Sequence, residues 1–326
     1  MFQKNNAPRN GGKKAIYQNA SLYSSTYHEG ITGFQDAIAA AGLGKPDIKP
    51  DGTIHRFRVD SDKAGTLNGW YVYFPVPVPA GAFGSWKTGQ SEKWCIKADH
   101  ELSHVERQQL AQQLEDARKA RKAEQQRQWN AAADKAVLRW GAAKPLDGVS
   151  IHPYLKHKQV QAHGLKLEGR GMLLVPLRDV SGRLWSLQTI TEAGEKRFVG
   201  GGKVSGCFHT IGTIDPAGLL FVCEGYATAA SIHKMHGAAV ACAMFADNLL
   251  PVALAIRARY PKAGLVIAGD NDRFTAGNPG ATKAEAAARA VGGRWVIPEF
   301  PPECSSGTDF NDLAVWEAAH HDQESL

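Results

Sequence analysis

The sequence has few cysteines, and they are not arranged as metal ligands. No two of them form a CxxC pair, the spacing that is typical of zinc ribbons. They are also scattered, whereas a disulfide framework repeats cysteines at short intervals. We therefore predict neither bound zinc nor a disulfide frame from the five, which are Cys95, Cys207, Cys223, Cys242 and Cys304.

Long apolar runs are missing as well. No stretch approaches the ~20 residues that a membrane helix needs. Residues 1–6 lack the apolar core of a secretory signal. We therefore expect a cytoplasmic protein that has no membrane partner.

The composition is that of a soluble globular protein with a basic balance. The chain has 326 residues, of which 43% are hydrophobic, and its formal net charge is +6. This length allows two domains with sizeable cores. A pI of about 9.0 fits a polyanionic partner but does not establish one, because many basic proteins bind no nucleic acid.

The first part of the chain predicts a small α+β module followed by a long helix. Residues 1–29 are polar and are interpreted as a flexible tail. Residues 30–98 combine one helical pattern with several short strand patterns and turn signals. Residues 99–145 contain almost no helix breaker, and they predict a solvated helical linker with a basic run at 118–122.

Aromatic and basic side chains gather in the strands of this first module. Among them, Arg56, Trp70 and Trp86 are candidates for a surface on which single-stranded nucleic acid stacks. The alternative is that the aromatic rings simply fill the core of a small sheet. Both interpretations stay open on the sequence.

Acidic residues follow two buried-type strand patterns in the last part of the chain. Leu219–Cys223 is followed by Glu224 and Gly225, and Leu265–Gly269 is followed by Asp270, Asn271 and Asp272. The carboxyl ends of strands in an open α/β sheet form its ligand-binding edge. Carboxylates gathered there repel one another unless a cation lies between them. Oxygen ligands favour Mg²⁺ or Mn²⁺ over zinc.

This pattern resembles the TOPRIM domain of bacterial-type primases, topoisomerases and some nucleases. The matching residues are Glu224-Gly225 after one strand and Asp270-x-Asp272 after a later one. The resemblance implies an α/β fold with a Rossmann-like parallel sheet at residues 216–326. Residues 309–312, Asp-Phe-Asn-Asp, resemble a step that follows TOPRIM in phage and plasmid primases. Asp309 and Asp312 are therefore further candidate metal contacts, and Asp312 could equally cap the last helix.

Residues 146–215 resemble the basic α+β subdomain that precedes TOPRIM in these primases. In that family the basic side chains hold template or nucleotide phosphate. Carried over, they are Arg178, Lys196, Arg197 and Lys203. Gly225 would let a phosphate approach the backbone at the start of the following helix. Residues 30–98 loosely resemble the N-terminal primase module, in a version without zinc ligands.

The resemblance implies a DNA primase encoded by a phage, plasmid or other mobile element. It would make short RNA primers on single-stranded DNA from nucleoside triphosphates. Asp270 and Asp272 are the expected metal ligands, and Glu224 is a further ligand or the general base. The glycine-rich loop before Lys203 is no Walker A motif, so any replicative helicase would be a separate protein or a portion missing from this chain.

Two alternatives remain open on the sequence. A TOPRIM nuclease would use the same carboxylates with water as the nucleophile. A catalytically silent nucleic-acid-binding replication factor would need neither the metal nor the acids. A topoisomerase is disfavoured because no catalytic tyrosine region is recognisable.

Overall fold

A computed structural model describes residues 27–146 and 152–324. The chain divides into two compact units, one that extends to Gln125 and one that begins at Gln126. Most of the predicted flexible tail, residues 1–26, lies outside the described residues. The finer division predicted from the sequence, with limits near residues 98, 145 and 215, stays a prediction.

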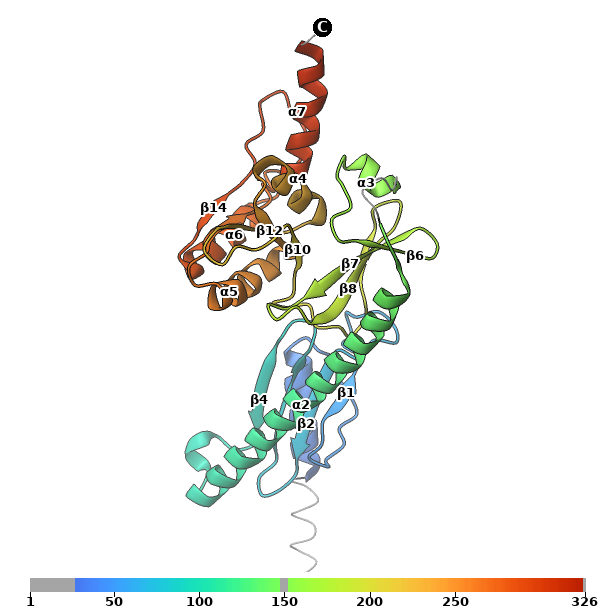
Figure 1. The fold of residues 1–326 in the computed structure, drawn as a ribbon. Helices are drawn as coiled ribbons and strands as arrows, with labels where there is room; N and C mark the ends of the chain where they lie inside the picture. The colour runs from blue at the N-terminus through green and yellow to red at the C-terminus, as the bar shows by residue number, and fades with distance from the viewer. Residues whose placement is uncertain (1–26, 147–151, 325–326) are drawn as a thin grey trace, which may run out of the picture. The chain divides into compact units, whose positions relative to one another are not determined.

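The first unit combines a helix at residues 27–40 with an antiparallel sheet (Figure 1). The sheet has the strand order β1-β2-β3-β4, with β1 at His55–Phe57, β2 at Gly69–Phe74, β3 at Ala80–Ser85 and β4 at Ser91–Cys95. Helix and sheet share an aromatic core that contains Phe34, Tyr71, Tyr73 and Phe83. Most of the aromatic side chains of β2 and β3 therefore serve the core, as the second interpretation of the sequence proposed.

Helix α2, His104–Ala142, is continuous over 39 residues. It follows the short 3-10 helix η1, Asp99–Glu101. Ser103 and Glu106 form its capping box, because the Ser103 hydroxyl accepts from the Glu106 N–H and the Glu106 carboxylate accepts from the Ser103 N–H. Its early residue Leu110 packs against Val78 and Ala80 of the first unit. The predicted solvated linker is thus a helix with buried contacts, since Ala133 and Ala136 are also buried, in cores of the second unit.

The second unit begins with an antiparallel sheet in the order β5-β6-β7-β8-β9. Its long central hairpin joins β7 to β8, as the sequence predicted. The strands are β5 at Lys144–Pro145, β6 at Lys166–Glu168, β7 at Met172–Arg178, β8 at Leu184–Ile190 and β9 at Lys196–Phe198, and the short helix α3 is at Pro153–His157.

The second sheet of this unit is mainly parallel, which confirms the predicted α/β class. Its order is β10-β12-β11-β13-β14, and only β10 pairs antiparallel. The strands are β10 at His209–Ile211, β11 at Leu219–Cys223, β12 at Ala239–Cys242, β13 at Gly264–Ala268 and β14 at Arg294–Val296. Its helices are α4 at Tyr226–His236, the 3-10 helix η2 at Ala246–Asn248, α5 at Leu249–Arg259, α6 at Pro279–Val291 and α7 at Phe310–Glu324.

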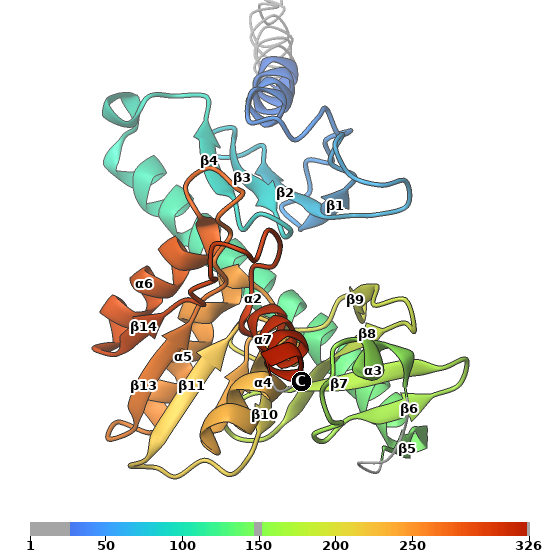
Figure 2. The same ribbon diagram turned by 90° about the horizontal axis from the view of Figure 1, so that it is seen from above.

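Helices cover both faces of this parallel sheet (Figure 2). Alternate residues of the central strands belong to different cores. Leu220 and Val222 belong to the core formed with α5 and α6, whereas Phe221 and Cys223 belong to the core formed with α4. The α4 core also contains β7 residues such as Val175. Burial on both faces explains why these strands are continuous apolar runs in the sequence.

Among the helices that the structure describes, none is long and apolar enough to cross a membrane.

Gly269 lies where β13 meets α6, and it tests this packing. A Cβ atom there would lie 2.5 Å from the Ala284 Cβ and 2.9 Å from the Gly280 carbonyl oxygen. We expect Gly269→Ala to lower the unfolding free energy by roughly 1–3 kcal/mol, since the tight contact forces the helix to shift. Thermal unfolding of wild type and of the Gly269→Ala variant measures this difference in unfolding free energy.

Gly141→Ala is the matched control for this substitution. Gly141 is in α2, and a Cβ atom there would have open space around it, with no described neighbour outside the helix within 4 Å. Alanine favours a helix over glycine by roughly 0.5–1 kcal/mol, so this variant should be equally or more stable than wild type. Equal stability of all three proteins would contradict the tight β13–α6 contact.

Candidate active site

Two acidic residues lie side by side at the carboxyl ends of adjacent parallel strands. Strand β11 pairs with β13 so that Cys223 is opposite Ala268. Glu224 follows the first strand directly, and Asp270 follows the second after Gly269. The first strand of this parallel set, β11, lies between β12 and β13, so the chain changes direction across the sheet between β11 and β13. Such a switch point is where open α/β sheets bind ligands.

Each of these two carboxylates has a buried oxygen without a hydrogen-bond donor. The atoms are Glu224 Oε1 and Asp270 Oδ1. Burial, together with the negative charges of Glu224, Asp309 and Asp272, raises the pKa of Asp270 to about 8. Burial also raises the pKa of Glu224, as does Asp272, while a hydrogen bond from the Asp270 backbone lowers it. A buried acceptor without a partner is costly, and a cation would relieve both the desolvation and the repulsion.

Asp272 is held by the start of helix α6. Its Oδ2 accepts the Gly280 N–H at 2.9 Å. The Asp272 N–H in turn donates to Asn278 Oδ1 at 2.8 Å, and Asn278 is the N-cap of α6 with a left-handed φ of 40°. A Cβ on Gly280 would clash with the Asp270 carbonyl oxygen, so only glycine lets α6 come this close. The structure therefore fixes Asp272 as part of a helix cap.

Asp309 and Asp312 both contribute to the start of helix α7. Asp309 Oδ1 accepts the Asp312 N–H at 2.8 Å. Asp312 accepts the Thr308 N–H at 3.1 Å, and its other oxygen pairs with Lys158 Nζ at 3.0 Å. Asp312 is thus a capping and ion-pairing residue, one of its two predicted roles. Asp309 still raises the pKa of Asp270 through its charge.

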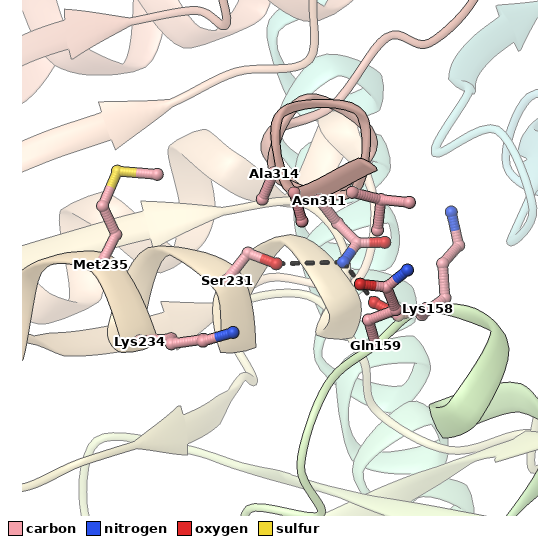
Figure 3. Close-up of a pocket in the computed structure, with 9 residues that line it drawn as sticks. Lys158, Gln159, Ser231, Lys234, Met235, Asn311 and Ala314 are labelled. Atoms are coloured by element: carbon pink, nitrogen blue, oxygen red, sulfur yellow. Dashed lines mark hydrogen bonds between the residues drawn. The ribbon is translucent and has the colours of Figure 1, made fainter. Parts of the chain in front are cut away.

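Asn311 anchors the start of α7 to α4 and to the backbone of Lys158 (Figure 3). Its side-chain nitrogen donates to the Lys158 carbonyl at 2.7 Å and to the Ser231 hydroxyl of α4 at 3.0 Å. The side chain is only 1% exposed. The Asp-Phe-Asn-Asp step therefore docks the last helix beside the carboxyl edge of the sheet.

The donor set fits a hard divalent cation only in part. No three His, Cys, Asp or Glu side chains of the described residues are grouped closely enough to hold a metal by themselves. Mg²⁺, however, is usually held by one or two carboxylates together with substrate phosphates and water. The unpartnered oxygens of Glu224 and Asp270 match that demand, and Asp272 keeps its second oxygen available.

Lys196 is the predicted basic residue that faces the acids. Its charge lowers the pKa of Asp270, and its ammonium lies 5.9 Å from the centre of the Tyr154 ring. It lines a cavity of about 520 Å³ together with Tyr154, Lys158, His157 and Glu192. The cavity is lined by two lysines and one glutamate, and its volume lies in the range of small-ligand pockets.

The other three predicted basic residues are engaged elsewhere. Arg178 donates to the Gly182 carbonyl at 2.9 Å, within its own hairpin. Arg197 is strongly exposed and lies 3.4 Å from Glu195. Lys203 lies over the Trp185 ring at 4.8 Å. The described contacts do not bring these three side chains to the carboxylates, so their phosphate contacts stay predictions.

Two charged residues near Glu224 were missed by the sequence interpretation. Lys283 of α6 lowers the pKa of Glu224, while Asp247 raises it. The two form an ion pair of 2.8 Å. Lys283 lies four residues after the α6 start, and no sequence signal distinguished it from a solvated helix position.

The three candidates in the first unit have different environments. Arg56 in β1 is exposed. Trp70 is only 3% exposed, and the Arg121 guanidinium lies 4.4 Å from its ring centre. Trp86 is half-buried and lies 6.0 Å from Trp70. As arranged, Trp70 has no free face for a base, because Arg121 covers it.

Removing one buried carboxylate tests the repulsion at this site. A raised native pKa means that the native state holds a proton that the unfolded state releases, so stability falls as the pH rises from about 4 towards 8. In the presence of a metal chelator, Asp270→Asn should therefore have a higher melting temperature than wild type. The difference should be about 3 °C or more at pH ~9 and smaller at pH ~5. Added Mg²⁺ should stabilise wild type and not the variant.

The control is Asp134→Asn, which changes an exposed carboxylate of α2 in the same unit. Its melting temperature should equal that of wild type at each pH, both with and without Mg²⁺. A melting difference for Asp270→Asn that does not change with pH or Mg²⁺ would contradict the inferred repulsion.

Comparisons with known proteins match a domain family within the second unit and longer stretches of two primases. Residues 219–319 match the Toprim domain family. The chain is 37% identical over 261 residues to the DNA primase TraC of Escherichia coli, across 77% of this chain and 24% of that protein. It is 37% identical over 285 residues to another TraC primase of Escherichia coli, across 82% of this chain and 19% of that protein. The chain thus spans about a quarter or less of these relatives.

A solved primase of Aquifex aeolicus, comprising zinc-binding and RNA polymerase domains, is also similar. It is 11% identical with a TM-score of 0.39, over 90% of this chain and 84% of that chain. Similarity at this level supports no conclusion about function. The sequence matches nevertheless confirm the resemblance to the TOPRIM domain that Glu224-Gly225 and Asp270-x-Asp272 indicated, and the similarity to DNA primases.

Proposed function

We propose that this chain, which contains a Toprim domain, is a DNA primase that makes short RNA primers on single-stranded DNA. The observation that carries the proposal is the pair of unpartnered buried oxygens, Glu224 Oε1 and Asp270 Oδ1, at the switch point of the parallel sheet. The matched Toprim family and the similarity to the TraC primases support the same activity.

The carboxylates would hold Mg²⁺ or Mn²⁺, with Asp270 and Asp272 as ligands, Glu224 as a further ligand or the general base, and Asp309 as a further ligand or a charge nearby. When bound, such an ion neutralises the charge that develops on a transferred phosphate. Because Asp272 is fixed by the Gly280 N–H, its second oxygen is presented in a constant direction. Glu224, whose pKa is raised, is suited to accept the proton of the attacking hydroxyl.

The nucleoside triphosphate would bind on the positive side of the site. Lys196 interacts electrostatically with Asp270 and lines the cavity of about 520 Å³, so it is the first candidate for a phosphate contact. Gly225 caps helix α4, where backbone N–H groups favour an anion. Arg178, Arg197 and Lys203 remain candidates for template contacts, and a separate replicative helicase remains a proposed partner.

De novo primer synthesis tests the activity. The protein is incubated with single-stranded DNA, labelled ATP, all four ribonucleotides and Mg²⁺ or Mn²⁺, and the products are resolved on a denaturing gel. We expect short labelled oligomers from wild type. Glu224→Gln and Asp270→Asn should each reduce them by about a hundredfold or more, because each removes a charge that the transition state needs.

Asp134→Asn is the control and should match wild type, since its exposed carboxylate is in α2 and takes no part in the site. Shortening of the template instead of primer synthesis would show a Toprim nuclease. Neither product, on several templates, would leave a nucleic-acid-binding factor as the function.

A further inference from the structure

A separate cavity in the first unit lies between the sheet and helix α2. It has a volume of about 340 Å³. Its apolar side is formed by strand and helix residues that include Trp70, Val72, Ala82 and Leu114. Its polar side carries three basic side chains, Lys93 of β4 and Arg118 and Arg121 of α2. The cavity is made entirely from residues before Gln125, so it belongs to one compact unit.

The side chain of Arg121 contacts uncharged groups. Its contacts are the Ser91 hydroxyl at 3.1 Å and the rings of Trp70 and Trp86, at 4.4 and 5.8 Å. Burial lowers its pKa, and the neighbouring charge of Arg118 lowers it further. A partly buried guanidinium beside a second one is an electrostatic cost to the free protein, and an anion would remove it.

The remaining charges around the cavity leave it positive. Of the lining residues described, Glu115 alone is acidic, and it pairs with Arg118 at 2.8 Å. The charge of Lys93 adds to that of Arg121. Cations that exceed the nearby carboxylate charge favour a ligand with anionic oxygen acceptors.

We infer that this cavity binds one nucleotide of a single DNA strand, with its phosphate on Arg121 and Lys93 and its base on the apolar wall. An apolar wall beside a basic rim suits a nucleotide of a single strand, because the base can pack against the wall while the cations contact the backbone phosphate. A duplex offers no unstacked base to the wall. The choice of DNA as the ligand rests on the proposed function.

This assignment moves the binding site predicted in the first unit. The free face of Trp70 is not required, since its ring forms part of the wall and supports Arg121. Arg56 is not among the lining residues. The basic run at 118–122, which the sequence left as a solvated face, contributes two of the three cations.

Binding of a fluorescein-labelled oligothymidylate of about 12 nucleotides to the full chain tests the inference, with anisotropy measured over a range of salt concentrations. Lys93→Ala should weaken binding by about tenfold at low salt and lower the slope of log K against log salt by about 0.7, the value for one lost phosphate contact. Glu115→Gln should strengthen binding, because it removes the acid from the cavity.

Arg121→Lys separates charge from geometry. It keeps the positive charge but loses the planar group that lies over Trp70, so affinity should fall several-fold with the salt slope unchanged. Lys119→Ala is the matched control, because Lys119 is an exposed cation of the same helix outside the cavity. Its effect should be smaller than that of Lys93→Ala.

Two results would overturn the inference. In one, Lys119→Ala and Lys93→Ala lower the affinity for the oligonucleotide equally. In the other, Lys93→Ala, Glu115→Gln and Arg121→Lys all leave that affinity unchanged. Either result is distinguishable from failure of the primase proposal. Normal primer synthesis with unaffected cavity variants would reject the cavity alone. Weakened binding in Lys93→Ala, in a protein that makes no primers, would keep the cavity and reject the polymerase activity.

Discussion

Repulsion between carboxylates at one sheet edge is the constraint on which the second unit depends. The parallel register of β11 and β13 brings Glu224 beside Asp270, and neither side chain finds donors for all its oxygens. Burial and the charges of neighbouring carboxylates raise both pKa values. The fold therefore stores an unfavourable arrangement that a bound cation and phosphate would relieve, which is how functional sites commonly depart from optimal stability.

The surrounding elements keep this arrangement from relaxing. The close approach of α6, possible because Gly269 and Gly280 have no side chains, fixes the loop that carries Asp272. Helix α7 is tied to α4 by Asn311 and to residue 158 by Asp312. Tight packing on both faces of the sheet leaves the acids little room to separate. Rigid support of this kind is what a precisely oriented phosphate-transfer site requires.

The two units have opposite electrostatic problems. The second gathers carboxylates that lack a cation, while the first contains a cavity whose Arg121 contacts uncharged groups. A metal ion with a nucleotide would neutralise the carboxylates of the second unit, and the phosphate of a single strand would neutralise Arg121 in the first. Both features follow from burying charge at sites where solvent is partly excluded. They give the two units distinct roles in the proposed handling of a template and a nucleotide.

The sequence by itself determined the strands, the helices between them and the order of the acids, because apolar periodicity and chain breakers are local properties. It thus predicted that Glu224 and Asp270 end neighbouring strands. Only the tertiary structure decided that Asp272 caps α6, that Lys283 lies near Glu224 and that Arg121 covers Trp70. These relations join residues far apart in the chain, and they depend on packing between elements, which no local pattern records.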